Sequence, residues 1–199
     1  LLSGAERAAW QVVCSGGPRP PEEGDAHRVT LQAVSERAAQ TLKIATRNNW
    51  LLDIALDHLT LGRAALYAAI LEGSSLEPCR APLQGAVDGL RRAGRSDYLP
   101  RGLLTRAWLR SLEDKRTGPE SAQSDLDEAW EIAERGPMKL FMADIHLHRA
   151  RLFFREAEYP WGSPAADLAG ARELIEKCGY GRRKEELEDA MRAIGGGGA

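Results

Sequence analysis

The sequence LGRAAL at residues 61–66 recurs as LTRAWL at 104–109 and as LHRARL at 147–152. The three copies share the pattern L-x-R-A-x-L, and the offset between successive copies is 43 residues both times. Self-similarity at a fixed period of this size is typical of proteins built from stacked structural repeats. This stretch therefore predicts a repeat fold.

A second repeated element lies between these copies. LQGA at 83–86 matches LDEA at 126–129 and LAGA at 168–171, with offsets of 43 and 42 residues. Within both elements the apolar residues are spaced by three and four, which indicates helices. Each period is therefore predicted to contain two helices.

The boundaries of these helices follow from the same pattern and from helix-terminating residues. We expect the first helix of each period at 50–72, 97–114 and 137–156, and the second at 75–93, 120–135 and 164–178. Further helices are expected at 1–15, 25–47 and 182–194. Ser163 before Pro164 is typical of a helix start. A glycine in a left-handed conformation is expected just after three helices, at Gly94, Gly136 and Gly179.

Small residues stand at the expected helix crossings, where they let two helices approach closely. They are Ala64, Ala107 and Ala150 in the first helices, and Ala86, Ala129 and Ala171 in the second. A two-helix unit of this kind buries its apolar face only by stacking on its neighbours. We therefore predict an all-α fold, a right-handed solenoid of stacked antiparallel helix pairs with a period of about 43 residues.

The chain divides into three parts on composition. Residues 1–24 are expected to form a partial N-terminal helix and a linker rich in proline and glycine, residues 25–194 the helical-repeat domain, and residues 195–199 a flexible glycine tail. Because the sequence begins with leucine inside an expected helix, we interpret the chain as a piece of a longer protein.

Composition and charge exclude several classes of function. The net charge of −2 gives no reason to expect nucleic acid or an anionic membrane as the partner. The stretch 50–71 is apolar but contains Asp53, Asp57 and Arg63, so we predict a buried helix and no membrane span. Three cysteines with no CxxC pair indicate a reducing, cytoplasmic setting without a zinc site.

The repeat resembles the tetratricopeptide repeat, because the segment from Leu61 and Gly62 to Tyr67 is similar to the leucine-glycine-x-x-tyrosine core of that motif. The later copies have Thr105 and His148 in place of the glycine.

The chain also resembles the C-terminal helical-repeat regions of bacterial signalling ATPases of the NACHT type. The resemblance covers roughly residues 30 to 193 and rests on NWLLDIALDH at 49–58, LPRGLL at 99–104, ADIHLHRARL at 143–152, YPW at 159–161 and GY at 179–180. It implies a module that senses a ligand or a partner for a separate nucleotide-binding domain. No G-x-x-x-x-G-K-[ST] loop is present, so we expect no nucleotide and no other cofactor to bind here.

Equivalent arginines occupy all three copies of the first helix, and we expect them in a row along a polar, concave groove. The residues predicted to line this groove are Asp53, Asp57, Arg63, Arg106, Arg110, His146 and Arg149. One hypothesis is a ladder that grips carboxylates or phosphates of a bound peptide. The alternative is that each arginine pairs with an acidic residue of a neighbouring helix and stabilises the stack.

The sequence favours a binding role over catalysis. His146 and His148 lie two residues apart on a helix, so they point to different sides, and no catalytic or metal site is predicted. The leading hypothesis is an interaction or ligand-sensing module that binds a peptide or protein surface, as part of a larger signalling protein. The alternative is a structural spacer or an oligomerisation scaffold, which predicts an exposed apolar patch at a terminal repeat and self-association.

Overall fold

The computed structural model describes residues 2–15 and 21–195, and every regular element within these residues is a helix. The prediction of an all-α fold is therefore confirmed for this part of the chain. The helices are α1 (Leu2–Ser15), α2 (Pro21–Arg47), α3 (Leu51–Glu72), α4 (Glu77–Arg92), α5 (Leu99–Leu112), α6 (Ala122–Arg135), α7 (Lys139–Phe153), α8 (Pro164–Lys177), the 3₁₀ helix η1 (Gly181–Arg183) and α9 (Lys184–Gly195).

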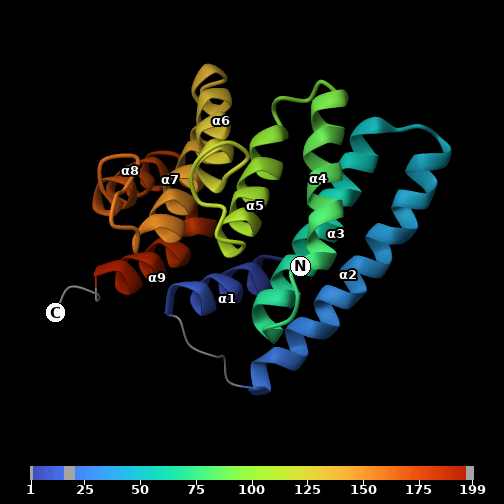
Figure 1. Ribbon diagram of the computed structural model, residues 1–199, viewed down its shortest axis with the longest axis horizontal. Helices are drawn as coiled ribbons and strands as arrows, with labels where there is room; N and C mark the ends of the chain where they lie inside the picture. Colours follow the sequence, from blue (N-terminus) through green and yellow to red (C-terminus); the bar gives the residue numbers. More distant parts are fainter. Residues whose placement is uncertain (1, 16–20, 196–199) are drawn as a thin grey trace.

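Consecutive helices pack against one another in pairs (Figure 1). The three central pairs are α3 with α4, α5 with α6, and α7 with α8. Helix α2 packs against α3 at one end of the stack, and α9 packs against α8 and α7 at the other. Helix α1 runs between these two ends, because it contacts α2, α3 and α9. The first and last helices of the described chain therefore meet.

Local sequence accounts for several of the helix ends. The Ser163 hydroxyl accepts a hydrogen bond from the backbone N–H of Ala166, so Ser163 caps α8 as predicted. Gly94 and Gly179 have positive φ angles of 64° and 62°, as predicted. Gly136 does not, since its φ is −92°. A Cβ at this position would lie 2.6 Å from Cε of Met138, so Gly136 provides room for a side chain.

The N-terminal boundary of the long helix α2 differs from the prediction. It begins at Pro21, four residues before the expected start at residue 25. Proline is favoured in the first turn of a helix, where its missing N–H has no partner to lose. The predicted linker therefore ends at residue 20, and residues 16–20 lie outside the described part, as do residues 196–199 of the predicted tail.

Helix α3 is long and apolar enough to cross a membrane by length and composition, a test that buried helices also pass. Within the fold it packs between α2 and α4 and also contacts α1. Its Arg63 forms an ion pair with Glu6 of α1. Its apolar composition is therefore explained by its place inside the helix stack.

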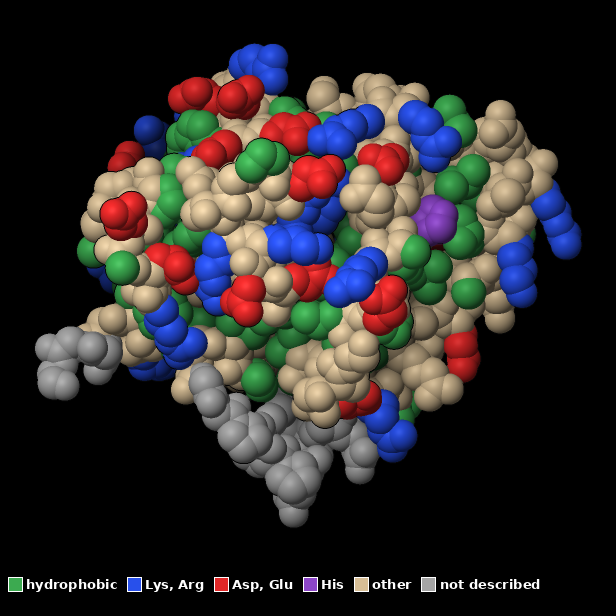
Figure 2. Space-filling model, viewed as in Figure 1, with side chains coloured by type: hydrophobic (Ala, Val, Ile, Leu, Met, Phe, Trp, Pro, Cys, Tyr) green, Lys and Arg blue, Asp and Glu red, His purple; other side chains and the backbone are tan. Residues whose placement is uncertain are grey.

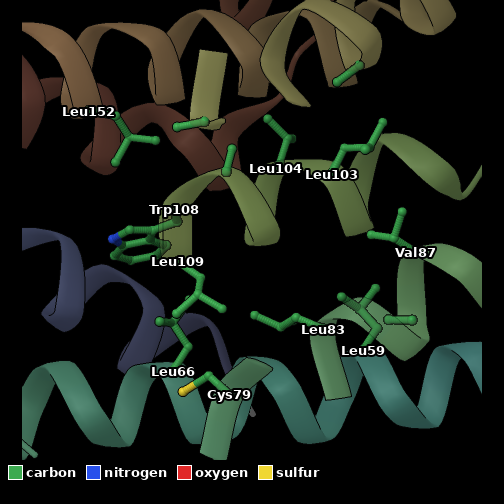
Figure 3. Packing of buried hydrophobic residues seen from close by; sticks show 14 of the residues in the cluster. Leu59, Leu66, Cys79, Leu83, Val87, Leu103, Leu104, Trp108, Leu109 and Leu152 are labelled. Atoms are coloured by element: carbon green, nitrogen blue, oxygen red, sulfur yellow. The ribbon is translucent and has the colours of Figure 1, made fainter. Parts of the chain in front are cut away.

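The core lies between the helix pairs. Figure 3 shows side chains of α3, α4 and α5 pointing toward one another, among them Leu66, Leu83 and Leu109. The alanines expected at helix crossings are at most 1% exposed; they are Ala64, Ala86, Ala107, Ala129, Ala150 and Ala171. Burial of side chains this small brings the helix backbones close together, which fixes the spacing of the stack.

The contact between α3 and α4 is closest at Gly89, where an added Cβ would lie 2.8 Å from Cβ of Ala55. We predict that Gly89→Ala forces these helices apart and lowers the free energy of unfolding by about 1–3 kcal/mol. Gly85→Ala, one turn earlier on α4, is the matched control. Its Cβ would meet the His58 ring at 3.6 Å, an ordinary contact, so improved helix propensity raises stability by up to about 1 kcal/mol. Urea denaturation measures both, and equal effects of the two substitutions would contradict this packing.

Candidate functional site

Helix α1 lies across the first helices of the three central pairs. Its Glu6 pairs with Arg63 of α3, and its Trp10 stacks on Trp108 of α5 and lies under Arg151 of α7. The carbonyl groups of Val13 and Cys14 accept hydrogen bonds from Arg155, just after α7. We call the surface that it covers the α1 face. The α1 face consists of Arg63, Tyr67, Trp108, His148, Arg151, Arg155 and Arg183.

The centre of the α1 face is aromatic. The rings of Trp10 and Trp108 stack with centroids 3.5 Å apart and an interplanar angle of 10°. The edge of His148 meets Trp10 at 5.0 Å, and the Arg151 guanidinium lies over Trp10 at 4.8 Å. Neither indole N–H, of Trp10 or of Trp108, has an acceptor among the described residues. Stacking and cation–π contact therefore hold Trp10 in place.

Beside this stack lies an ionic cluster that joins five helices, α1, α3, α7, η1 and α9. The Arg183 guanidinium of η1 donates to Glu6 of α1 at 3.2 Å and to Asp144 of α7 at 2.8 Å. It also donates to Glu186 of α9 at 2.6 Å. Glu6 in turn accepts a 2.7 Å hydrogen bond from Arg63. Nearly all of these side chains are buried, so each has lost its hydration. The opposite charge beside it compensates for that loss.

Burial and neighbouring charges shift the pKa values of this cluster in opposite directions. Burial raises the pKa of the Glu6 carboxyl, but Arg183 and Arg63 together more than reverse this and lower it to about 2. Burial lowers the pKa of His148 to about 3, although its Nδ1–H donates to the carbonyl oxygen of Asp144. At neutral pH Glu6 of α1 is therefore charged, and His148 of the α1 face is neutral.

Two of the arginines predicted for the groove lie between the helices of one pair, with Arg106 buried and Arg110 partly buried. Arg106 donates from Nε and Nη2 to both carboxylate oxygens of Asp125 on α6, and from Nη1 to Gln84 on α4. Arg110 reaches the same Asp125 at 2.9 Å. Burial raises the pKa of Asp125 despite these two cations. Both arginines therefore bind within the stack, as the alternative hypothesis expected.

Arg149, the equivalent arginine of the third repeat, contacts mainly aromatic rings. The Arg149 guanidinium lies between the rings of Trp130 and Trp161, at 4.7 and 4.6 Å, and its Nη2 is 3.5 Å from Asp127. Its Nε is buried and has no acceptor among the described residues.

The loop between α7 and α8 packs locally, because the Trp161 indole N–H donates to Asp127. The neighbouring His146 bonds through Nδ1 to Asp167 of α8, at 2.5 Å.

The equivalent arginine of the first repeat turns toward α1. One period before Asp125 stands Pro82, so α4 offers Arg63 no carboxylate at the equivalent position. Arg63 donates instead to Glu6 and, from Nε, to the Tyr67 hydroxyl at 3.0 Å. Equivalent arginines therefore have different partners, since each partner set depends on residues outside the repeated pattern.

The two predicted aspartates lie near α2. Asp57 accepts a hydrogen bond from the Thr41 hydroxyl, and Asp53 is exposed. The seven predicted residues thus have four separate sets of neighbours, and the expected single groove is not formed by them. Among the predicted residues only Arg63 belongs to the α1 face.

Sequence reasoning missed the α1 residues that complete the site. Glu6 and Trp10 lie outside the repeats, and Arg183 lies in the helix expected at residues 182–194, where no site residue was predicted. The available signal was the helix at residues 1–15, which carries an acidic residue one turn before a tryptophan. In the described part of the chain no group of three His, Cys, Asp or Glu side chains is arranged to hold a metal ion.

Comparison with known proteins adds no identification: no family model matches the sequence, and no curated protein or solved structure matches the chain.

The low pKa of His148 predicts a loss of stability in acid. The unfolded chain takes up a proton at this residue below pH 6.5, whereas the folded chain does so only near pH 3. The free energy of unfolding therefore falls as the pH drops through this window, by up to about 1.4 kcal/mol per pH unit for this residue. His148→Leu removes the effect, so urea denaturation at several pH values should show a shallower pH dependence for the variant. Parallel profiles would disprove the assignment.

The buried pair of Arg106 and Asp125 predicts a large loss of stability on truncation. Arg106→Gln leaves a buried carboxylate with one cation fewer, and we expect a loss of about 3–5 kcal/mol by chemical denaturation. Arg91→Gln is the control, because its pair with Glu128 is exposed and contributes at most about 1 kcal/mol. Similar losses for both variants would show that Arg106 does not stabilise the stack.

Proposed function

We propose that this chain is a protein-interaction module whose α1 face recognises an amphipathic helix. The observation that carries the proposal is α1 itself, which lies on this face with Trp10 stacked on Trp108 and Glu6 paired with Arg63. A groove that accommodates a helix of its own chain has the shape and the charge to receive another helix of the same chemistry.

The contacts of α1 define the motif that such a partner presents. Its buried positions are Ala5, Glu6, Ala8, Ala9, Trp10 and Cys14. The alanines let the helix backbone approach closely, while Glu6 and Trp10, four residues apart, lie on one side. The proposed partner is therefore a helix with a glutamate one turn before a tryptophan and small residues between them.

The ionic part of the contact favours specificity. Glu6 loses its hydration when α1 is seated, and the attraction of Arg183 and Arg63 more than offsets that cost, so that its pKa falls to about 2. A helix that lacked the glutamate would leave two buried arginines with one carboxylate fewer. The α1 face thus discriminates between helices that carry this glutamate and helices that lack it.

The repeat architecture supports the same class of function. We propose that the helix pairs form a right-handed, tetratricopeptide-like solenoid with the α1 face on its concave side, since buried alanines recur at equivalent positions of each pair. The resemblance to the repeat regions of NACHT-type signalling ATPases makes a sensing role in a larger protein our preferred interpretation. The unbridged Cys14, Cys79 and Cys178 agree with a cytoplasmic location.

Binding of a free α1 peptide tests this proposal. In the wild-type chain the attached α1 competes for the α1 face at an effective concentration near the millimolar range. A fluorescent peptide of residues 2–15 should therefore bind to the wild-type chain at least about tenfold more weakly than to a Glu6→Gln, Trp10→Ala variant. Ser3→Ala, at an exposed α1 position, is the matched control and should behave as wild type. Fluorescence anisotropy measures the dissociation constants.

A second peptide makes the outcome decisive. The same peptide with Glu6→Gln and Trp10→Ala should bind none of the proteins, because it lacks both anchors. Circular dichroism establishes that each variant keeps its helices. If the folded double variant binds neither peptide, or binds both equally, the α1 face is not a helix-recognition site.

A further inference from the structure

A small pocket lies at the edge of the α1 face, where α1, α3, α5, α7 and η1 meet, and its volume is about 30 Å³. Pockets for drug-sized ligands measure about 300–1,000 Å³, so this one admits only a compact chemical group. Charged side chains from these five helices line it; they are Glu6, Arg63, Arg101, Asp144, Arg182 and Arg183. The balance of these charges decides which group the pocket can bind.

Four of these charges cancel within the ionic cluster. Arg183 donates hydrogen bonds to both Glu6 and Asp144. Arg63 donates to Glu6 as well, so two cations balance the two acids of the pocket. The third acid of the cluster, Glu186, does not line the pocket and has a second arginine of its own. The acids of the cluster therefore leave no negative charge to balance any further cation.

Two further arginines line the pocket without an acid beside them. Among the described residues, the guanidinium of Arg101 in the first turn of α5 has only the ring of Phe141 as a partner, 5.9 Å from its centroid. The side chain of Arg182 in η1 forms no ion pair or hydrogen bond within the described part of the chain. On the face shown in Figure 2, by contrast, most basic side chains lie among acidic ones. The pocket therefore has two positive charges that no described acid balances.

Hydrogen-bond donors of the pocket lining are unused as well. Tyr67 is 1% exposed, and its hydroxyl oxygen accepts a hydrogen bond from Nε of Arg63 at 3.0 Å. The hydroxyl proton itself has no acceptor among the described residues, and neither has Nη1 of Arg63. A buried donor without an acceptor costs free energy, so a ligand atom that accepts a hydrogen bond is favoured here.

We infer that this pocket binds a phosphate group between Arg101 and Arg182, with the Tyr67 hydroxyl as a further donor. A phosphate monoester carries a charge of about −1.5 to −2 at neutral pH, which matches two unbalanced guanidinium groups better than the single charge of a carboxylate does. Guanidinium groups also donate to phosphate oxygens in pairs. The pocket is formed while α1 is seated, so the inference does not rest on the proposed helix recognition.

Titration calorimetry of the full chain with inorganic phosphate tests this site. At neutral pH and constant ionic strength, the wild-type chain should bind phosphate in a saturable manner. The double variant Arg101→Gln, Arg182→Gln removes both unbalanced charges and should raise the dissociation constant at least about tenfold. The double variant Arg47→Gln, Arg92→Gln is the matched control, because it removes two exposed arginines outside the pocket and should leave the dissociation constant unchanged. Circular dichroism establishes that both variants keep their helices.

Two further ligands define the chemistry of the site. Acetate, with a single charge, should bind at least about tenfold more weakly than phosphate. Glycerol phosphate presents the same group as a monoester, so its binding assigns the pocket to phosphorylated small molecules, whereas binding of free phosphate alone assigns it to inorganic phosphate. The inference is overturned if the wild-type chain binds neither phosphate ligand at millimolar concentration. Equal dissociation constants for the two double variants, or acetate binding as tight as that of phosphate, overturn it too.

Discussion

The structure depends on one guanidinium that connects the two ends of the described chain. Arg183 bonds to Glu6 of α1, to Asp144 of α7 and to Glu186 of α9, so it joins the first helix, the last helix and the stack between them. Because all four groups are buried, the loss of any one leaves charges without compensation. The position of α1, and with it the coverage of the α1 face, follows from this constraint and from the stack of Trp10 on Trp108.

This arrangement gives the repeat stack two different surfaces. On the α1 face, the charged and aromatic groups are already paired with α1, so access to them requires that α1 be displaced. At α2 the stack ends without a neighbouring helix pair, and apolar residues remain in solvent. A stack of helix pairs buries its core only where another element covers it, so the outer side of a terminal helix keeps its apolar residues exposed.

The arginines of the repeated pattern show how tertiary contacts diversify equivalent positions. Arg106 binds Asp125, Arg149 lies between two tryptophans, and Arg63 turns to α1 where Pro82 stands in place of a carboxylate. A long side chain with several torsions reaches whichever acceptor is near. The same residue in three copies therefore stabilises three different contacts.

The sequence by itself determined the helices and their order, because apolar spacing, caps and buried alanines are local or periodic signals. It placed α3, α4 and α8 within two residues of their observed starts, and it missed the start of α2 by four residues, since the effect of Pro21 on a helix start was not weighed. Only the tertiary structure decided which side chains meet. Glu6 and Arg183 are separated by most of the chain, and no local pattern links them. Whether a surface is open or covered depends on such long-range contacts, because it is a property of the packed stack and not of any one helix.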